Sequence, residues 1–351
     1  MVVFGHLQTE AALMPAAAAY GFSPVIVDLT GAGVDLFFVI SGFVMVFASR
    51  DLFGQKYGAR LFLARRMARI VPLYWAATTL FLATMLLSPA SLSSAAPSLA
   101  EIVKSYLFIP FARAGAEAIQ PVYKLGWTLN YEMFFYAIFA LCLFLPRQKA
   151  VGAVVGILVI LAGGGLWWRQ EPGAIAFWSH PIVLEFGCGA LLANARMNGL
   201  RWPGAACAAL ALAGVAGFAA SVYFSVPAHG VLRPLVWGIP AALLIASAAL
   251  GDSGWPQGRL AGLALLLGDA SYSIYLVHPI LIRVMRLVWD KSGASVTLNP
   301  WVFVGGVMLL IVMASVLVYR WFEKPATRWA QEWPGVGRRV LPVPQKATAA
   351  A

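Results

Sequence analysis

Charged residues are scarce in this chain, and their scarcity excludes a soluble globular protein. Asp, Glu, Lys and Arg make up 11% of the 351 residues, whereas hydrophobic residues make up 61%. A soluble domain carries about 25% charged residues. Apolar runs of roughly 20 residues, the length of a membrane-spanning helix, recur along the sequence, and the alternating pattern of a membrane barrel is missing. We therefore expect an all-α fold, built as a polytopic transmembrane helical bundle.

Cysteine and the common cofactor motifs are also scarce. The three cysteines, Cys142, Cys188 and Cys207, fall in apolar segments without paired spacing, which predicts small buried residues rather than a disulfide or metal framework. The sequence has no P-loop, no dinucleotide-binding glycine pattern, no Cys/His set with metal-ligand spacing and no GxSxG motif. We expect no metal site and no tightly bound cofactor.

The apolar runs predict about ten spans, the first of which is truncated. They lie at residues 1–13, 31–49, 70–87, 127–145, 150–168, 181–195, 203–222, 232–250, 264–287 and 300–319. Together they predict a membrane domain of residues 1–330. The Pro- and Ala-rich residues 331–351 are expected to form a disordered cytoplasmic tail.

The net charge of +11 is explained by membrane orientation rather than by nucleic-acid binding. Most of the 25 Lys and Arg residues lie at one set of helix ends, and they are concentrated at residues 50–69. The positive-inside rule places that loop and the C-terminus in the cytoplasm. Ten crossings then place the N-terminus there too, with His6 toward the outer half of the first helix.

Few ionisable residues fall inside the predicted spans. They are His6, Asp35, Glu132, Glu185 and His278. A charged side chain at the bilayer centre costs at least about 2.5 kcal/mol on insertion scales, so a functional role is the first interpretation of such a residue.

Two of these residues belong to motifs near helix ends. In "GVDLFFVISGFVM", Asp35 shares a face with Phe38 and with Ser41 or Gly42. Gly42 would let a neighbouring helix approach closely. The alternative role for Asp35 is a helix cap. In "HLQTE", Glu10 follows His6 by one turn, and a carboxylate at that spacing could hold the imidazole in one tautomer.

The stretch "GWTLNYEMFFY" predicts a polar stripe. Thr128, Glu132 and Tyr136 are spaced i, i+4, i+8 and align on one helix face. Trp127 would lie at the outer membrane boundary, and its alternative role is an ordinary interfacial aromatic. That alternative does not explain Glu132, which needs a partner inside the membrane.

The stretch "DASYSIYLVHP" predicts a second polar ridge. Ser271, Tyr275 and His278 follow at i, i+4, i+7 on an otherwise apolar helix. Pro279 is expected to kink that helix and to free backbone carbonyls. His278 is either functional or a structural histidine hydrogen-bonded across helices.

The stretch "ARRMARIVPLYW" contains an arginine cluster at the cytoplasmic mouth of a span. Arg65 and Arg69 are predicted to share a face, with Arg66 adjacent. The cluster is either a set of positive-inside anchors or a phosphate clamp, because arginine binds phosphate in a bidentate manner that lysine cannot match. Together these signals indicate transfer between a phosphorylated cytoplasmic donor and an outer acceptor. A transporter or flippase is the alternative, although no inverted repeat is visible.

With these motifs identified, the sequence resembles the integral-membrane acyltransferases of acyltransferase family 3, which O-acetylate bacterial surface polysaccharides. The resemblance covers about residues 1–330 and rests on six stretches in the family's order: "VVFGHL", "GVDLFFVISGFVM", "FLARRMARIVPLYW", "WTLNYEMFFY", "GDASYSIYLVHP" and "YRWFEKPA". It implies a multi-pass protein of the bacterial inner membrane that moves an acyl group from acyl-CoA, usually acetyl-CoA, to a hydroxyl of a glycan or lipid-linked acceptor. A succinyl-transferring relative would change the donor and leave the class unchanged.

The resemblance also implies roles for particular residues. The family's histidine, thought to be essential, matches His6, its arginine motif matches Arg65, Arg66 and Arg69, and its aromatic–acidic motif matches Trp127, Glu132, Phe135 and Tyr136. Combining the resemblance with the residue patterns, we expect catalytic roles for His6, Glu10, Glu132 and Tyr136, donor binding by Arg65, Arg66 and Arg69, and site-organising or substrate-binding roles for Asp35, Trp127, Ser271, Tyr275 and His278.

One feature departs from the family pattern. Members carry an arginine eleven positions before the histidine, and counting back from His6 passes Met1 before that position is reached. We expect either a start upstream of Met1 or a truncated form. In the expected reaction, His6 removes the acceptor's hydroxyl proton, and Tyr136, Tyr275 or Ser271 stabilises the oxyanion. An acyl-histidine intermediate is the variant.

Overall fold

The computed structural model describes residues 1–87, 96–112, 119–167, 173–226, 230–252 and 258–332. Within these ranges the chain is helical and forms no strand beyond two isolated β-bridges, which confirms the expected all-α fold. The helices are α1 (Val2–Ala12), α2 (Pro24–Leu29), α3 (Ala32–Ala48), α4 (Gly58–Leu87), α5 (Leu99–Tyr106), α6 (Gly126–Cys142), α7 (Arg147–Gly165), α8 (Ala174–Trp178), α9 (Leu184–Met197), α10 (Gly204–Tyr223), α11 (Ile239–Ala249), α12 (Arg259–Asp269), α13 (Ser271–Lys291), α14 (Ala294–Thr297), α15 (Pro300–Val318) and α16 (Lys324–Glu332). Two π-helical turns, Pro234–Gly238 and Tyr319–Glu323, precede α11 and α16.

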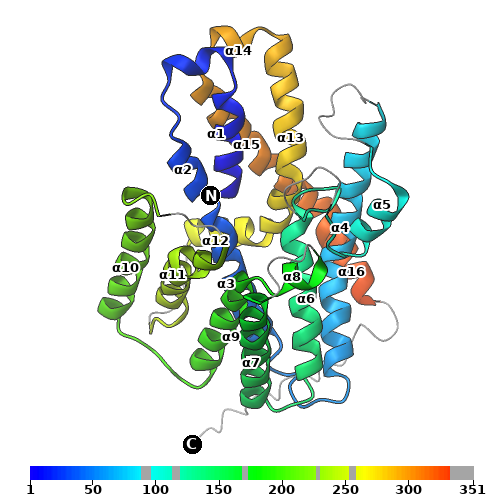
Figure 1. The fold of residues 1–351 in the computed structure, drawn as a ribbon, viewed down its shortest axis with the longest axis vertical. Helices are drawn as coiled ribbons and strands as arrows, with labels where there is room; N and C mark the ends of the chain where they lie inside the picture. Colours follow the sequence, from blue (N-terminus) through cyan, green and yellow to red (C-terminus); the bar gives the residue numbers. More distant parts are fainter. Residues whose placement is uncertain (88–95, 113–118, 168–172, 227–229, 253–257, 333–351) are drawn as a thin grey trace, which may run out of the picture.

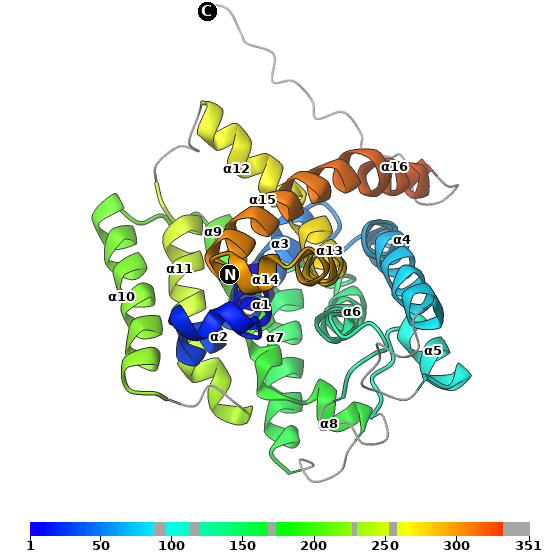
Figure 2. The same cartoon turned by 90° about the horizontal axis from the view of Figure 1, so that it is seen from above.

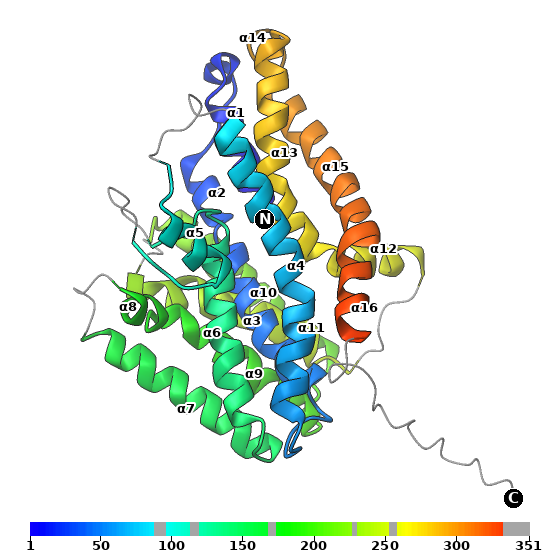
Figure 3. The same ribbon diagram turned by 90° about the vertical axis from the view of Figure 1, so that its right-hand side faces the viewer.

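The helices form an elongated bundle. Figure 1 shows α1, α13 and α15 grouped at one end, with α3, α6, α7 and α9 toward the other. Helix α4 runs along much of the length in both Figure 1 and Figure 3. Seen end-on in Figure 2, α1 lies near the centre, with α10 and α11 on one side and α4 and α5 on the other. Helix α1 packs mainly against α15 and also contacts α13, α2 and α3.

Six helices in the described part of the chain are long and apolar enough to cross a membrane. They are Ile26–Ala48, Gly58–Met85, Arg147–Gly165, Gly204–Tyr223, Gly230–Ala249 and Pro300–Trp329, and the α12–α13 pair makes a seventh if it is one bent span. The expected count of ten is not confirmed, because α1, α6 and α9 have 11, 17 and 14 residues. The protein is nevertheless a polytopic helical membrane protein.

Two predicted spans require correction. The span expected at 264–287 is a pair of helices, α12 and α13, that meet at 65° around Ala270. Helix α13 continues through Pro279, so the sharp bend lies at the start of the polar ridge rather than at the proline. The span expected at 70–87 begins at Gly58, which places the arginine cluster inside the helix instead of at its mouth.

Helices α3 and α9 pack with their backbones in close contact, as Gly42 predicted. A Cβ atom added to Gly42 would lie 2.0 Å from the carbonyl oxygen of Phe186, and one added to Gly189 would lie 2.0 Å from that of Val39. Only glycine permits this approach. The ring of Phe38 stacks on Phe186 at 4.6 Å between centroids, so the two helices form the central wall of the bundle.

Two other expectations concern single residues and the tail. Cys142 is buried, as expected, whereas Cys207 is half-buried and Cys188 is exposed. The predicted tail at 331–351 lies outside the described residues except for its first two positions, which end α16.

Candidate active site

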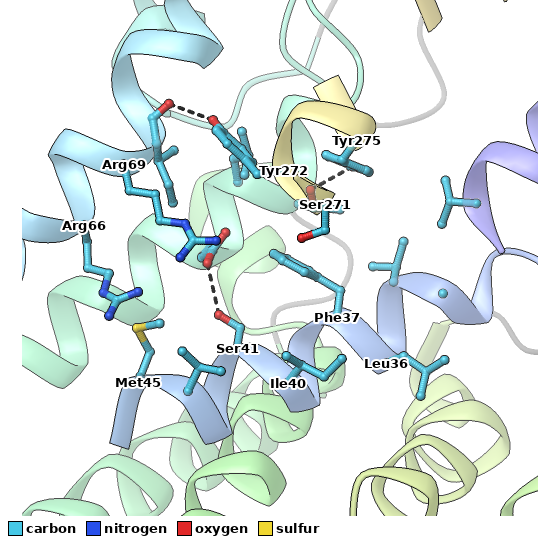
Figure 4. Close-up of a pocket in the computed structure, with 18 of the residues that line it drawn as sticks. Leu36, Phe37, Ile40, Ser41, Met45, Arg66, Arg69, Ser271, Tyr272 and Tyr275 are labelled. Atoms are coloured by element: carbon cyan, nitrogen blue, oxygen red, sulfur yellow. Dashed lines mark hydrogen bonds between the residues drawn. The ribbon is translucent and has the colours of Figure 1, made fainter. Parts of the chain in front are cut away.

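A cavity of about 420 Å³ lies between α3, α4, α6 and α13. Figure 4 shows arginines of α4 on one side of it and the first turns of α13 across from them. Most of its walls are apolar side chains of α3, α4 and α6. Its polar lining consists of Ser41, Arg66, Arg69, Thr128, Glu132, Tyr136, Ser271, Tyr272 and Tyr275. We call it the donor cavity.

The two arginines that line the donor cavity are Arg66 and Arg69. They are three residues apart on α4 and therefore share a helix face; Arg65, which was predicted to pair with Arg69, does not line the cavity. Arg66 lies 5.8 Å over the ring of Phe62, and its buried Nε has no hydrogen-bond partner among the described residues. In that part of the chain no salt bridge neutralises either arginine. The pair can therefore bind an incoming anion.

Glu132 lies in the wall of this cavity. Its side chain is buried, and its Oε1 accepts a hydrogen bond of 3.0 Å from Ser41 Oγ and another from the Tyr136 hydroxyl. Arg66 and Arg69 both attract its charge. The predicted stripe of Thr128, Glu132 and Tyr136 is thus confirmed as one face lining one cavity. Because Glu132 is held by two hydroxyl donors, the geometry suits an organising role better than that of a free base.

A second cavity, of about 250 Å³, contains the predicted catalytic histidine. Its polar and aromatic lining consists of His6, Thr9, Asp28, Thr30, Trp127, Arg233 and Tyr275. We call it the histidine cavity. His6 comes from α1, Trp127 from α6 and Tyr275 from α13, so three helices far apart in sequence meet here. Trp127 is a wall of this cavity as well as an aromatic residue near a helix start.

The partner of His6 is His278. The Nδ1 atom of His6 lies 2.9 Å from Nε2 of His278, and the two rings stack at 5.1 Å between centroids. His278 is fully buried, and its Nδ1 lies 3.1 Å from the carbonyl oxygen of Ile274. A carbonyl only accepts, so Nδ1 of His278 carries the proton of that bond. In a neutral His278 the Nε2 atom must then accept from His6, which leaves Nε2 of His6 with a free lone pair.

This geometry differs from the predicted pairing of His6 with Glu10. No hydrogen bond joins the two side chains in the described structure, and the backbone carbonyl of Glu10 accepts from Arg286. The ring of His6 points instead across to α13, where His278 provides the orienting contact predicted for the carboxylate. The i, i+4 spacing shows that His6 and Glu10 are neighbours on α1. It does not show that a residue of another helix, His278 on α13, lies closer to the His6 ring.

Helix α13 connects the two cavities. Ser271 lines the donor cavity, Tyr275 lines both cavities, and His278 lies behind His6. The predicted i, i+4, i+7 ridge is therefore a continuous polar path. The Tyr275 hydroxyl donates to the carbonyl oxygen of Leu125 at 3.0 Å and lies 2.9 Å from Thr128 Oγ1. This fixes Tyr275 as the shared wall.

Asp35 lines neither cavity. It is fully buried in the first turn of α3, where both carboxylate oxygens accept from Arg233: Oδ1 from Nε at 3.0 Å and Oδ2 from Nη2 at 2.8 Å. Asp35 thus acts on the site through Arg233. Sequence analysis did not single out Arg233, and the one signal for it was that a buried aspartate needs a cation.

Two buried glutamates complete the electrostatics. Glu323, in the second π-helical turn, accepts 2.5 Å from Ser273 Oγ and attracts Arg69. Sequence analysis missed it, although it lies inside the quoted "YRWFEKPA" stretch. Glu185 is buried, and neither of its carboxyl oxygens has a hydrogen-bond partner among the described residues. Of these two, only Glu323 is tied to the arginine pair.

The segment before α6 is anchored to α13 by Tyr123. Its hydroxyl donates to the carbonyl oxygen of Leu276. Burial raises the pKa of Tyr123 well above its usual value, so the hydroxyl remains a donor at any physiological pH. This bond holds the start of α6 against the ridge.

The fold and the two cavities define a polytopic membrane protein with an arginine-lined cavity beside a histidine site. The family model described as an acyltransferase domain matches residues 1–320, and the chain belongs to this family, acyltransferase family 3. It is 33% identical over 298 residues to the exopolysaccharide production protein ExoZ of Rhizobium meliloti (strain 1021), covering 85% of this chain and 89% of that protein. It is 28% identical over 356 residues to the acyltransferase MdmB of Streptomyces mycarofaciens, covering 92% of this chain and 86% of that protein. No solved structure matches.

Family membership makes the chain a membrane O-acyltransferase. Of the two classes that the residues alone left open, the acyltransferase is therefore the correct one and the transporter is not. The roles of the individual site residues remain predictions. The geometry shows only where each residue lies and what it contacts.

Proposed function

We propose that this protein transfers an acyl group, acetyl in the simplest case, from acyl-CoA to a hydroxyl of a glycan or lipid-linked sugar at the bacterial inner membrane. The observation that carries the proposal is the path along α13: Ser271 in the donor cavity, Tyr275 between the cavities and His278 against His6. A thioester entering from one cavity and an alcohol entering from the other would meet at Tyr275.

The donor cavity suits acyl-CoA in its charge and its lining. Arg66 and Arg69 form no salt bridge among the described residues and can bind phosphate oxygens through charge-assisted hydrogen bonds. The apolar walls beyond them can accept the narrow pantetheine arm. Basic residues between α3 and α4, such as Arg50 and Lys56, would face the cytoplasm by the positive-inside rule, together with the C-terminus.

The chemistry needs a base, and His6 provides one. In the proposed step, Nε2 of His6 takes the proton from the acceptor hydroxyl while that oxygen attacks the thioester carbonyl. The new ester C–O bond forms, the C–S bond breaks, and the CoA thiolate takes the proton back from His6. His278 keeps Nδ1 of His6 occupied, so Nε2 of His6 is the atom left with a lone pair to react.

Of the three expected oxyanion donors, Ser271 is the one whose hydroxyl is free in the described structure. Tyr136 donates to Glu132, and Tyr275 donates to the carbonyl of Leu125. Ser271 lines the donor cavity at the first turn of α13. It is therefore the best-placed side chain to donate to the carbonyl oxygen of the thioester.

The acceptor class is supported by one relative and by the histidine cavity. The printed name of the Rhizobium relative refers to exopolysaccharide production. The histidine cavity has hydroxyl, carboxylate and guanidinium groups along its lining, which suit an alcohol-rich ligand.

The direct test uses the full chain in nanodiscs with radiolabelled acetyl-CoA and a crude bacterial glycolipid fraction. We expect label in the lipid fraction and a rise in melting temperature with CoA, as ligand linkage requires. The same assay with radiolabelled succinyl-CoA shows which acyl group the protein transfers. A protein that neither transfers label from either donor nor is stabilised by CoA would rule the proposal out.

A further inference from the structure

We propose that Arg233 is an acceptor-binding residue of the histidine cavity and that, together with Asp28, it selects an uncharged sugar over a carboxylated or phosphorylated one. This inference rests on the proposed function and deepens it, because it states that the acceptor is uncharged and names the residues that distinguish it from an anionic one.

Arg233 is held in one orientation. Its Nε and Nη2 atoms donate to the two oxygens of Asp35, Nη2 also donates 3.2 Å to the carbonyl of Gly31, and the guanidinium lies 5.1 Å over the ring of Trp237. Its Nη1 atom has no hydrogen-bond partner among the described residues, and the side chain lines the histidine cavity. Arg233 therefore offers a fixed donor with little conformational entropy left to lose on binding.

The charge of Arg233 is already balanced. Asp35 is fully buried and forms a bidentate pair with it, so the pair has no net charge to offer an anion. Asp28 is exposed, lines the same cavity and has no ion-pair partner in the described part of the chain. The cavity thus offers a hydrogen-bond donor, Arg233, and an acceptor, Asp28. The net charge of these groups together with Asp35 is negative, which repels an anionic ligand.

The donor cavity has a different arrangement of charges. Arg66 and Arg69 line it with no salt-bridged carboxylate among the described residues, whereas Arg233 faces the histidine cavity already paired. A phosphate would therefore be drawn to the first cavity and not to the second. Trp127 adds a flat apolar wall beside His6, so a neutral sugar ring gains both hydrogen bonds and a packing surface.

The test compares two matched probes, octyl β-glucoside and octyl β-glucuronide, as acceptors for radiolabelled acetyl-CoA with the full chain in nanodiscs. The probes differ only in a carboxylate. We expect the glucoside to be acylated at least tenfold faster. Asp28→Lys should reduce that preference at least tenfold, because it reverses a charge in the lining. Asp51→Lys makes the same change at an exposed position after α3 and should leave the preference unchanged.

Arg233→Lys tests the donor itself. It keeps a cation opposite Asp35, which Arg233→Ala would leave buried and unpaired, but it loses the planar fork and the free Nη1. We expect KM for the glucoside to rise about tenfold while CoA-induced thermal stabilisation stays the same.

Several results would overturn the inference: equal or faster use of the glucuronide, transfer to neither probe, a preference that Asp28→Lys does not move, or an unchanged glucoside KM in Arg233→Lys. A failure of the proposed function looks different. In that case CoA would not stabilise the wild-type protein, and no acceptor in the glycolipid fraction would be labelled.

Discussion

The two cavities of this bundle differ in size and in whether their arginines form salt bridges. The donor cavity is the larger of the two, and much of its lining is apolar. Its two arginines, Arg66 and Arg69, have no salt-bridge partner in the described structure. The histidine cavity is smaller, and its one arginine is paired with a buried carboxylate. The first arrangement suits a long ligand with a charged end and an apolar arm, and the second suits a small neutral ligand that must be oriented. Tyr275, which lines both, marks where the two ligands would meet.

The largest expected effect separates chemistry from donor binding. His6→Ala removes the proposed base, and since general acid–base catalysis contributes roughly 10²–10⁴-fold, we expect acyl transfer to fall about 10³-fold. CoA-induced stabilisation should not change, because His6 does not line the donor cavity. Radiolabel transfer and melting curves on the same preparation give both readouts. Wild-type rates in this variant would exclude His6 as the base.

The second effect tests the donor side alone. Arg66→Ala and Arg69→Ala each remove a proposed phosphate contact, and a charge-assisted hydrogen bond is worth about 1.5–3 kcal/mol, so KM for acetyl-CoA should rise roughly 10–100-fold with a smaller change in kcat. Arg65→Ala is the matched control, because Arg65 is on the same helix but outside the cavity. An equal rise in all three variants would indicate a general charge effect instead of specific contacts.

A third experiment disturbs both cavities together. Helix α3 contributes Ser41 to the donor cavity and also carries Asp35, which pairs with Arg233 of the histidine cavity. The position of α3 depends on its contact with α9. Gly189→Ala would place a Cβ atom 2.0 Å from the Val39 carbonyl oxygen, and overpacking of this kind costs about 1–3 kcal/mol. We expect a lower melting temperature and parallel losses in donor and acceptor binding.

Gly187→Ala is the control for that experiment. Its Cβ would meet only side-chain atoms of Leu158 and Val155, at 3.7 and 3.8 Å, which is ordinary contact. The same residue change on the same helix should therefore leave the melting temperature nearly unchanged. Equal destabilisation by both variants would mean that helix propensity, and not the close approach, explains the effect.

A fourth experiment asks what His278 does for His6. His278 touches His6 but lines neither cavity, so it is a positioning residue. His278→Leu removes the acceptor of the Nδ1 hydrogen bond, and we expect kcat to fall about tenfold with KM for acetyl-CoA unchanged. His278→Gln, which can still accept that bond, should recover most of the loss. The pH dependence of kcat should shift in His278→Leu and return in His278→Gln, which a purely structural role would not produce.

The sequence predicted the site correctly where all the polar residues of a pattern lie on one helix. The stripe at Thr128, Glu132 and Tyr136 follows from helical spacing alone, and all three residues line the donor cavity. The ridge on α13 follows from the same spacing: Ser271 and Tyr275 line the cavities, and His278 contacts His6. Sequence reasoning failed where a contact joins two helices. The pairing of His6 with His278, 272 residues apart, depends on a packing arrangement that periodicity does not contain.

The arginine cluster shows the same limit on a smaller scale. The sequence places three arginines together, but which two face the cavity depends on how α4 is rotated against its neighbouring helices, and periodicity does not contain that packing. The bend at Ala270 was misplaced for a related reason. Proline is a strong local signal, yet the break in the helix pair lies where α12 and α13 part, nine residues before Pro279 in the sequence.

The smallest expected effect concerns the wall between the cavities. Tyr275→Phe keeps the ring that separates them and removes only a hydroxyl whose hydrogen already goes to the carbonyl of Leu125. We therefore expect less than about a tenfold loss of transfer, whereas Ser271→Ala, which removes the free hydroxyl, should lose about 10–100-fold. Single-turnover transfer rates at saturating acetyl-CoA measure both. The reverse order would assign the oxyanion contact to the Tyr275 hydroxyl instead of the Ser271 hydroxyl.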